Sequence, residues 1–235
     1  MENSDRNVVF VPGLLCDERL FEAQRAALEE EGFRTSVADV SQDATVEGMA
    51  RRLLAEAPER FSLVGLSMGG YVALAAVREA PERIERLALL DTSARPDTEE
   101  QKESRRELVE AAKSGEFLKV AEGMPEKLLH ESRLVDGELV EKVVRMGLDT
   151  GPEVFEQQEE AVMARPDSRP DLPNVPCPTL VLCGREDALT PPEVHEELAE
   201  SIPDASLRVV ERCGHLSSLE RPEEVSAALR ELLGR

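Results

Sequence analysis

The sequence predicts an α/β fold with a parallel sheet, and three observations support this class. Short apolar or β-branched runs alternate with segments that carry apolar residues at helical spacing. Parallel strands need such alternation, because each strand must be joined to the next by a crossover that packs on a face of the sheet. The strand signal disappears between about residues 95 and 171, where only helical patterns remain. The length of 235 residues suits one domain of this class with a modest insertion.

The apolar runs predict about six strands, which we expect at residues 8–11, 34–40, 61–66, 87–91, 179–183 and 207–210. Helices are expected at residues 19–31, 46–57, 68–79, 192–201 and 222–233. We therefore expect a mostly parallel sheet of about six strands with helices on both faces.

The middle segment is expected to form four helices, at residues 99–113, 117–129, 137–148 and 152–164. We interpret residues 95–171 as a helical cap, inserted into a core that consists of residues 1–94 and 172–235. Its apolar side chains either line a substrate pocket or pack against the core. The pocket candidates in the cap are Phe117, Leu118, Met124, Leu128, Leu129, Met146, Phe155 and Met163.

Ser67 carries the most specific signal in the chain. It lies in Gly65-Leu66-Ser67-Met68-Gly69-Gly70, between a strand-like run and a helix-like run. This is the pattern of a nucleophile elbow, a strained turn with positive φ at the serine and glycines two residues before and after it. The pattern predicts that Ser67 is an exposed nucleophile at the end of a strand.

A serine hydroxyl needs a histidine base and a carboxylate that orients the imidazole. Of the three histidines, His215 follows a strand-like run and lies in a loop, whereas His130 and His195 lie in charged helical segments and are interpreted as solvated. Asp187 follows the run 179–183, and the carboxyl ends of parallel strands are where sites assemble. We therefore expect Asp187 to orient His215.

Two other carboxylates compete for a role. Asp91 also follows a predicted strand and is the alternative acid, although its Asp-Thr-Ser setting is typical of a turn, and the Gly-x-x-Asp setting favours Asp187. Glu220 comes shortly after His215, and we expect it to bond loop amides or a helix end.

The order Ser67, Asp187, His215 along the chain is that of the α/β-hydrolases. The segments VGLSMGG at 64–70, LCGRED at 182–187 and GHLSSLERP at 214–222 resemble motifs of that superfamily, and the chain is similar to its small bacterial-type serine esterases. The resemblance covers nearly the whole chain except the middle segment. It implies the α/β-hydrolase fold and an enzyme that cleaves a small carboxylic ester through an acyl-enzyme, with no metal or organic cofactor. The alternatives are an enol-lactone or C–C bond hydrolase of the same fold, and a ligand-binding relative without catalysis.

One motif departs from the family pattern. The loop after the first strand usually reads His-Gly, but here it reads Pro12-Gly13-Leu14. Because backbone amides form an oxyanion hole, the loss of a histidine side chain need not remove it. The resemblance places the two donors at the amides of Leu14 and Met68.

The composition excludes some classes of binding partner. The chain has 49 acidic and 28 basic residues and a net charge of −21, which repels nucleic-acid phosphates and anionic membranes. No apolar leader or membrane-length run is visible, so a cytoplasmic protein with a small-molecule ester substrate is expected, while monomer and homodimer both stay open. The cysteines are scattered and are expected to serve packing; they are Cys16, Cys177, Cys183 and Cys213.

Overall fold

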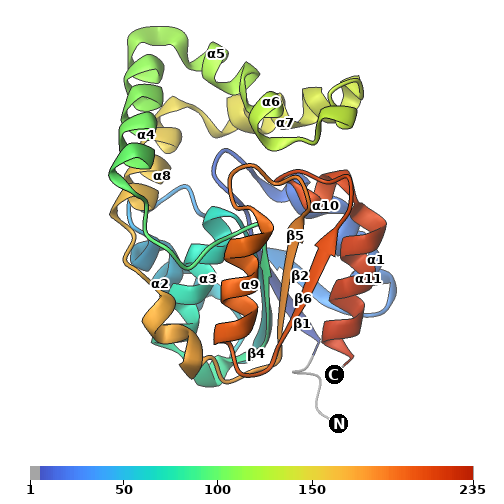
Figure 1. The fold of residues 1–235 in the computed structure, drawn as a ribbon. Coiled ribbons are helices and arrows are strands. Elements are labelled where there is room, and N and C mark those ends of the chain that lie inside the picture. Colours follow the sequence, from blue (N-terminus) through green and yellow to red (C-terminus); the bar gives the residue numbers. More distant parts are fainter. Residues whose placement is uncertain (1–5, 235) are drawn as a thin grey trace.

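Six strands form one fully parallel sheet at the centre of the molecule (Figure 1). The computed structural model describes residues 6–234, so the first five residues, where the absence of a leader was noted, lie outside the described part. The strands, in the spatial order β2-β1-β3-β4-β5-β6, are β1 (Asn7–Val11), β2 (Arg34–Val37), β3 (Phe61–Leu66), β4 (Ile84–Leu90), β5 (Thr179–Gly184) and β6 (Ala205–Val210). The second strand was expected at residues 34–40 but is shorter, because its ladder with β1 ends at Val37.

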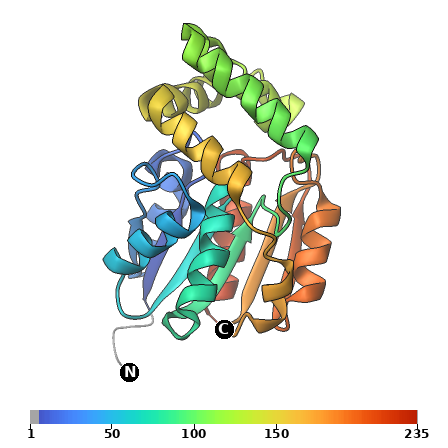
Figure 2. The ribbon, with the colours of Figure 1, turned by 90° about the vertical axis from the view of Figure 1, so that its left-hand side faces the viewer.

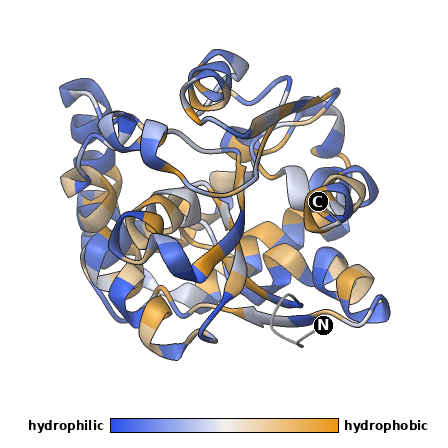
Figure 3. Cartoon of the chain, turned by 90° about the horizontal axis from the view of Figure 1, so that it is seen from below, coloured by the Kyte–Doolittle hydropathy of each residue, from blue (hydrophilic) through white to orange (hydrophobic). Residues whose placement is uncertain are grey.

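Helices cover both faces of the sheet. One face carries α2 (Val46–Glu56), α3 (Met68–Glu79) and α9 (Pro192–Ser201), and the other carries α1 (Glu22–Glu30) and α11 (Pro222–Leu233) (Figure 1). In Figure 3 the hydrophobic residues gather in the strands and on the helix faces turned toward the sheet, as two buried faces require. The predicted fold class is confirmed.

The two core layers follow from side-chain alternation along the strands. On β4, Leu87 and Leu89 belong to the core beneath α2 and α3, whereas Ala88 and Leu90 belong to the core beneath α1 and α11. All six residues of β3 and all six of β5 are buried, as expected for central strands with helices on both sides. Burial on both faces holds the carboxyl ends of these strands, which carry the site, in fixed positions.

The order of the strands creates a crevice. The chain passes from β1 to β2 on one side and returns to β3 on the other side of β1. The loops that leave β1 and β3 therefore run in opposite directions, and ligands bind at such switch points of open parallel sheets. These two loops contain Gly13 and Ser67, and the candidate site lies between them.

Five α-helices stand between β4 and β5 in the sequence and lie above the carboxyl ends of the strands (Figures 1 and 2). They are α4 (Glu99–Ala111), α5 (Phe117–Glu122), α6 (Met124–Leu128), α7 (Gly137–Thr150) and α8 (Pro152–Ala164); the short α10 (Ser217–Glu220) follows β6. The start of α4 has a local cause, since Thr98 and Gln101 form a reciprocal capping box. Met146 and Phe155 are fully buried and continue the core cluster that includes α1 and α11.

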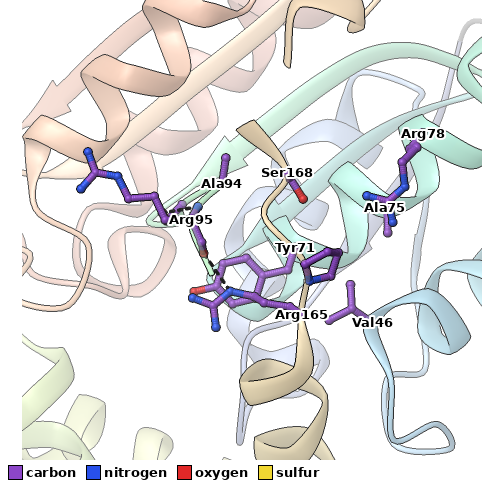
Figure 4. A pocket seen from close by; sticks show the side chains of 10 residues that line it. Val46, Tyr71, Ala75, Arg78, Ala94, Arg95, Arg165 and Ser168 are labelled. Atoms are coloured by element: carbon purple, nitrogen blue, oxygen red, sulfur yellow. Dashed lines mark hydrogen bonds between the residues drawn. The ribbon is translucent and has the colours of Figure 1, made fainter. Parts of the chain in front are cut away.

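The two segments that join these helices to the sheet lie side by side. The Ser168 amide donates to the Ala94 carbonyl at 2.9 Å, and the Arg165 Nε donates to the Arg95 carbonyl at 3.1 Å. The guanidinium of Arg165 lies over the ring of Tyr71, 4.2 Å from its centroid (Figure 4). These contacts tie the helical segment to α3, which starts at the candidate nucleophile. Within residues 6–234, none of the helices combines the length and apolarity needed to span a bilayer.

Candidate active site

Ser67 occupies the turn between β3 and α3 with φ 55° and ψ −117°, a left-handed conformation that only a tight turn imposes on serine. A Cβ at Gly65 would lie 2.3 Å from the carbonyl oxygen of Gly69, and a Cβ at Gly69 would lie 2.0 Å from that of Val11. Both glycines are therefore required by the close approach of backbone to backbone. The predicted elbow is present in this geometry.

Replacement of Gly65 by alanine is expected to destabilise the fold by about 3 kcal/mol or more, because the new methyl group meets backbone atoms that cannot rotate away. The matched control is Gly137→Ala, at the first residue of α7, where no atom lies within 4 Å of the added carbon. Urea unfolding of both variants measures the difference. Equal midpoints would contradict the steric argument.

His215 brings its imidazole to Ser67. It lies in the loop after β6 and is 3% exposed, with Nε2 2.8 Å from the Ser67 Oγ. Its backbone amide donates to the carbonyl oxygen of Leu128 at 2.7 Å, so the end of α6 holds the loop in place. In this position Nε2 can accept the hydroxyl proton of Ser67.

Asp187 lies on the other side of the imidazole, in the loop after β5. The Nδ1 of His215 is 2.8 Å and 2.9 Å from its two carboxylate oxygens, so this nitrogen carries the hydrogen and donates it. The Thr190 hydroxyl donates to Asp187 at 2.7 Å, and the Leu189 and Thr190 amides donate at 2.9 and 3.0 Å. The carboxylate is therefore fully bonded and oriented although it is only 2% exposed.

The two pKa values shift in opposite directions. Burial raises the pKa of Asp187. The charge and hydrogen bond of His215 and the donors of Thr190 lower this pKa by more than burial raises it, so the net direction is downward. Burial lowers the pKa of His215, but the charge and hydrogen bond of Asp187 raise it, and the net direction is upward. A carboxylate that stays ionised beside the imidazole suits a base that must take up a proton.

Asp91, the alternative acid, has other partners. Its carboxylate accepts from the Gly184 amide at 3.1 Å and from the amide and hydroxyl of Ser217 at 3.1 and 2.5 Å. It makes no hydrogen bond to the imidazole of His215. Gly184 ends the strand that leads to Asp187, and Ser217 lies two residues after His215, so Asp91 ties the two loops together.

The predicted oxyanion donors lie beside Ser67. A Cβ at Gly13 would lie 3.4 Å from the Ser67 Cβ, so the loop after β1 contacts Ser67, and Leu14 and Met68 both line the adjoining cavity. Met68 is the first residue of α3, where an amide has no intrahelical acceptor and lies at the positive end of the dipole. The geometry is compatible with the predicted roles of both amides.

Gln158, which the sequence analysis did not single out, supports this loop. It is buried on α8, and its Oε1 accepts from the Leu15 amide at 3.0 Å while its Nε2 donates to the Val40 carbonyl at 3.4 Å. The only signal in the sequence that could have identified Gln158 is its helical spacing from apolar residues, which would place it on the buried side of the helix.

A cavity of about 530 Å³ opens in front of Ser67 and His215, between the sheet and the helical segment. Of the eight apolar pocket candidates, Met124 and Leu128 line it, together with Leu108 and Val162, while Phe155 and Met146 pack in the core. Much of the remaining wall from the helical segment is polar or charged. The volume suits a small organic molecule.

The interpretation of His195 as solvated is wrong. The ring is 0% exposed, its Nε2 accepts from the Thr92 amide at 2.9 Å, and its Nδ1 lies 3.3 Å from the Pro191 carbonyl. The Thr92 hydroxyl in turn donates to the backbone carbonyl of Ser67 at 2.7 Å. His130 is also less free than expected, since it caps a short 3₁₀ helix and is only partly exposed. A buried histidine therefore helps to hold the nucleophile turn.

Burial lowers the pKa of His195 to about 4 in the folded protein, whereas the unfolded chain titrates near 6.5. As pH falls below about 6.5 the unfolded chain binds this proton and the folded protein does not, so stability is lost. Between pH 7 and pH 5 the wild type is expected to lose about 2 kcal/mol more than His195→Gln. Urea unfolding at both pH values tests this, and parallel losses in the two proteins would contradict it.

Glu220 and the four cysteines have surroundings typical of residues that stabilise the fold. Glu220 accepts from the amides of Gly214 and His130 at 2.9 and 2.8 Å, which matches the expected bonding of loop amides. All four cysteines are buried and free, and burial raises the pKa of Cys16, which lines the cavity, to about 12. Among residues 6–234 there is no group of three or more His, Cys, Asp or Glu side chains that could hold a metal ion.

Comparisons with known proteins agree with this architecture. The sequence model of the alpha/beta hydrolase family matches residues 8–228. The structure of a thermophilic esterase from Thermogutta terrifontis with malate bound is 38% identical, with a TM-score of 0.88 over 97% of this chain and 89% of that chain. The chain therefore belongs to the alpha/beta hydrolase family.

Two curated relatives are more distant. A pimeloyl-[acyl-carrier protein] methyl ester esterase from Photobacterium profundum is 25% identical in an alignment of 219 positions that covers 83% of this chain and 78% of that protein. A 2-hydroxy-6-oxononadienedioate/2-hydroxy-6-oxononatrienedioate hydrolase from Burkholderia vietnamiensis is 28% identical over 182 residues, 75% of this chain. The match spans 63% of the latter protein's length.

Proposed function

We propose that the chain is a serine hydrolase that cleaves a small carboxylic ester through an acyl-enzyme intermediate. The observation that carries the proposal is the chain of hydrogen bonds from Ser67 Oγ to His215 Nε2 at 2.8 Å and from His215 Nδ1 to Asp187 at 2.8 Å. It starts at an elbow and faces a cavity large enough for a substrate. We assign residues 1–94 and 172–235 to the catalytic core and residues 95–171 to a cap over the cavity.

In the first half of the reaction His215 takes the Ser67 proton, and Oγ attacks the ester carbonyl carbon. The amides of Met68 and Leu14 hold the negative oxygen of the tetrahedral intermediate. His215 then gives the proton to the leaving alkoxide, and the acyl group stays on Ser67. Asp187 keeps the imidazole oriented and stabilises its positive form.

In the second half a water molecule replaces the alcohol. His215 takes its proton, the hydroxide attacks the acyl carbon, and the Ser67 oxygen leaves with the proton returned by His215. The products are a carboxylic acid and an alcohol. Each step uses only groups of this chain and water.

A second candidate is an enol-lactone or C–C bond hydrolase. The relative from Burkholderia vietnamiensis, named for a dienedioate and trienedioate hydrolase, favours it. The same three side chains serve this chemistry, so the substrate decides between the two.

The test is burst kinetics with p-nitrophenyl acetate, combined with titration by a fluorophosphonate and intact mass. One label per chain at Ser67 and turnover of the ester are expected. Labelling without ester turnover would favour the second candidate, and enol-lactones and vinylogous diketones would then be tested as substrates. A folded protein that is neither labelled nor active would overturn the proposal in favour of a ligand-binding relative.

A further inference from the structure

The charge of the cavity differs from the charge of the chain. The chain carries 49 acidic and 28 basic residues, whereas the cavity is lined by four cationic side chains and two carboxylates. The cations are Arg95, Arg105, Lys127 and Arg165, and the carboxylates are Asp97 and Glu159. A local excess of positive charge inside a strongly acidic protein favours an anionic ligand in this cavity.

The three arginines have carboxylate partners. Arg165 pairs with Asp97 at 2.8 Å, and Arg105 bridges Asp97 at 2.7 Å and Glu159 at 2.8 Å. Arg95 pairs with a carboxylate of α9 outside the cavity lining. The pairs of Arg105 and Arg165 are largely buried, and they hold α4 and α8 together beside the core, whereas the Arg95 side chain is half-exposed.

Two donors at this wall stay free. The Lys127 ammonium makes no hydrogen bond or ion pair with any residue between 6 and 234, and the Nη2 of Arg105 has no partner there either. Lys127 and Arg105 both line the cavity in front of Ser67. The two free donors therefore belong to the same ligand space.

The backbone that follows Lys127 is bonded to the loop of His215. The carbonyl of its neighbour Leu128 accepts from the His215 amide at 2.7 Å, and the amide of His130 donates to Glu220 at 2.8 Å. The end of α6 is thus bonded to the loop that carries the base. Lys127 is exposed and lines the cavity, one residue before this attachment.

We propose that Lys127, together with the free Nη2 of Arg105, forms a subsite for a carboxylate that the ester substrate carries in addition to the scissile bond. A carboxylate is acceptor-only and takes hydrogen bonds from several donors at once, which matches one ammonium and one guanidinium nitrogen. The substrate class is therefore an anionic ester, such as the monoester of a dicarboxylic acid. This inference rests on the serine-hydrolase function proposed above.

The experiment compares two matched pairs of esters. One pair places the charge in the acyl part, p-nitrophenyl hemiglutarate against p-nitrophenyl pentanoate, and the other places it in the alcohol part, 4-acetoxybenzoate against 4-acetoxybenzamide. The wild type is expected to prefer the anionic member of one pair by about tenfold or more in kcat/KM. The pair that shows the preference assigns the carboxylate to the acyl or the alcohol side.

Substitutions then identify the residue that causes the preference for the anionic ester. Lys127→Met is expected to lower kcat/KM for the anionic ester by about tenfold, mainly through KM, and to leave the neutral ester within about twofold. Lys127→Arg restores the preference. The control is Lys119→Met, which removes the same charge from a cap lysine that pairs with Glu116 outside the cavity lining, and it is expected to change neither ester.

The two proposals fail in different ways. An absent preference in both pairs, or one that survives Lys127→Met, overturns the subsite while labelling of Ser67 and turnover of neutral esters still support the hydrolase. If no ester is cleaved and Ser67 is not labelled, calorimetry with glutarate and glutaramide tests the subsite alone. Equal binding of the two probes, or glutarate binding unchanged in Lys127→Met, then overturns it.

Discussion

Replacement of Ser67 by alanine is expected to lower kcat for every ester that the protein hydrolyses by about 10⁶-fold. The Oγ of Ser67 is the one atom placed both at the elbow and 2.8 Å from the His215 Nε2. Without it the base has no hydroxyl to activate, and only the oxyanion donors and substrate binding contribute. Steady-state rates and the size of the p-nitrophenol burst measure the loss.

A thiol does not replace the missing hydroxyl. Cys16 lines the cavity, but burial raises its pKa to about 12, so it stays protonated and a weak nucleophile at neutral pH. The matched control is Ser104→Ala on α4, an exposed serine that lines the same cavity and bonds to no member of the triad. Wild-type rates are expected there. Turnover above 1% in Ser67→Ala, after fluorophosphonate treatment has removed contaminating hydrolases, would show that another group attacks the ester.

The strands and the elbow could be predicted because their signals are local. The sheet follows from apolar runs that are buried on both faces, and the elbow follows from glycines that close backbone contacts require. The proximity of Ser67, Asp187 and His215 followed from the rule that parallel strands end at one edge. The rule brings the loops together, and the hydrogen bonds observed here complete the geometry.

Other features depend on contacts that a sequence does not display. His195 has charged neighbours on its helix, but its ring turns inward to Thr92, which lies 103 positions away. The polar wall of the cavity was missed for the same reason, since Arg105 and Lys127 are on helices whose charged residues resemble a solvated face. Amphipathic spacing shows which side of a helix above the sheet is buried, but it does not show whether that side meets the core or a cavity.

The choice between Asp187 and Asp91 leads to the second large effect. Asp187→Asn is expected to lower kcat by about 10⁴-fold, because an amide that donates to Nδ1 stabilises the tautomer whose Nε2 carries the hydrogen and cannot accept the Ser67 proton. Asp91→Asn is expected to cost roughly tenfold in rate and about 1–3 kcal/mol in stability, since Asp91 bonds Gly184 and Ser217 instead of the imidazole. The matched pair separates an acid that acts on the base from a carboxyl that joins loops.

The pH dependence of kcat/KM gives an independent measure of the same difference. His215 works only in its neutral form, so activity falls as pH drops through the pKa of the free enzyme. Burial lowers that pKa and Asp187 raises it above the usual 6.5, so the acid limb of the wild type is expected above pH 6.5. Removal of the Asp187 charge takes away the largest of the carboxylate contributions to this pKa, and the limb moves to lower pH in Asp187→Asn. In Asp91→Asn the limb moves less, because burial and the charge of Asp187 raise the pKa of Asp91 itself to about 8, so this carboxyl carries little charge where His215 titrates. The measurement is kcat/KM of both variants between pH 5 and 9. A larger shift of the acid limb in Asp91→Asn than in Asp187→Asn, together with the larger rate loss, would show that Asp91 is the acid that orients His215.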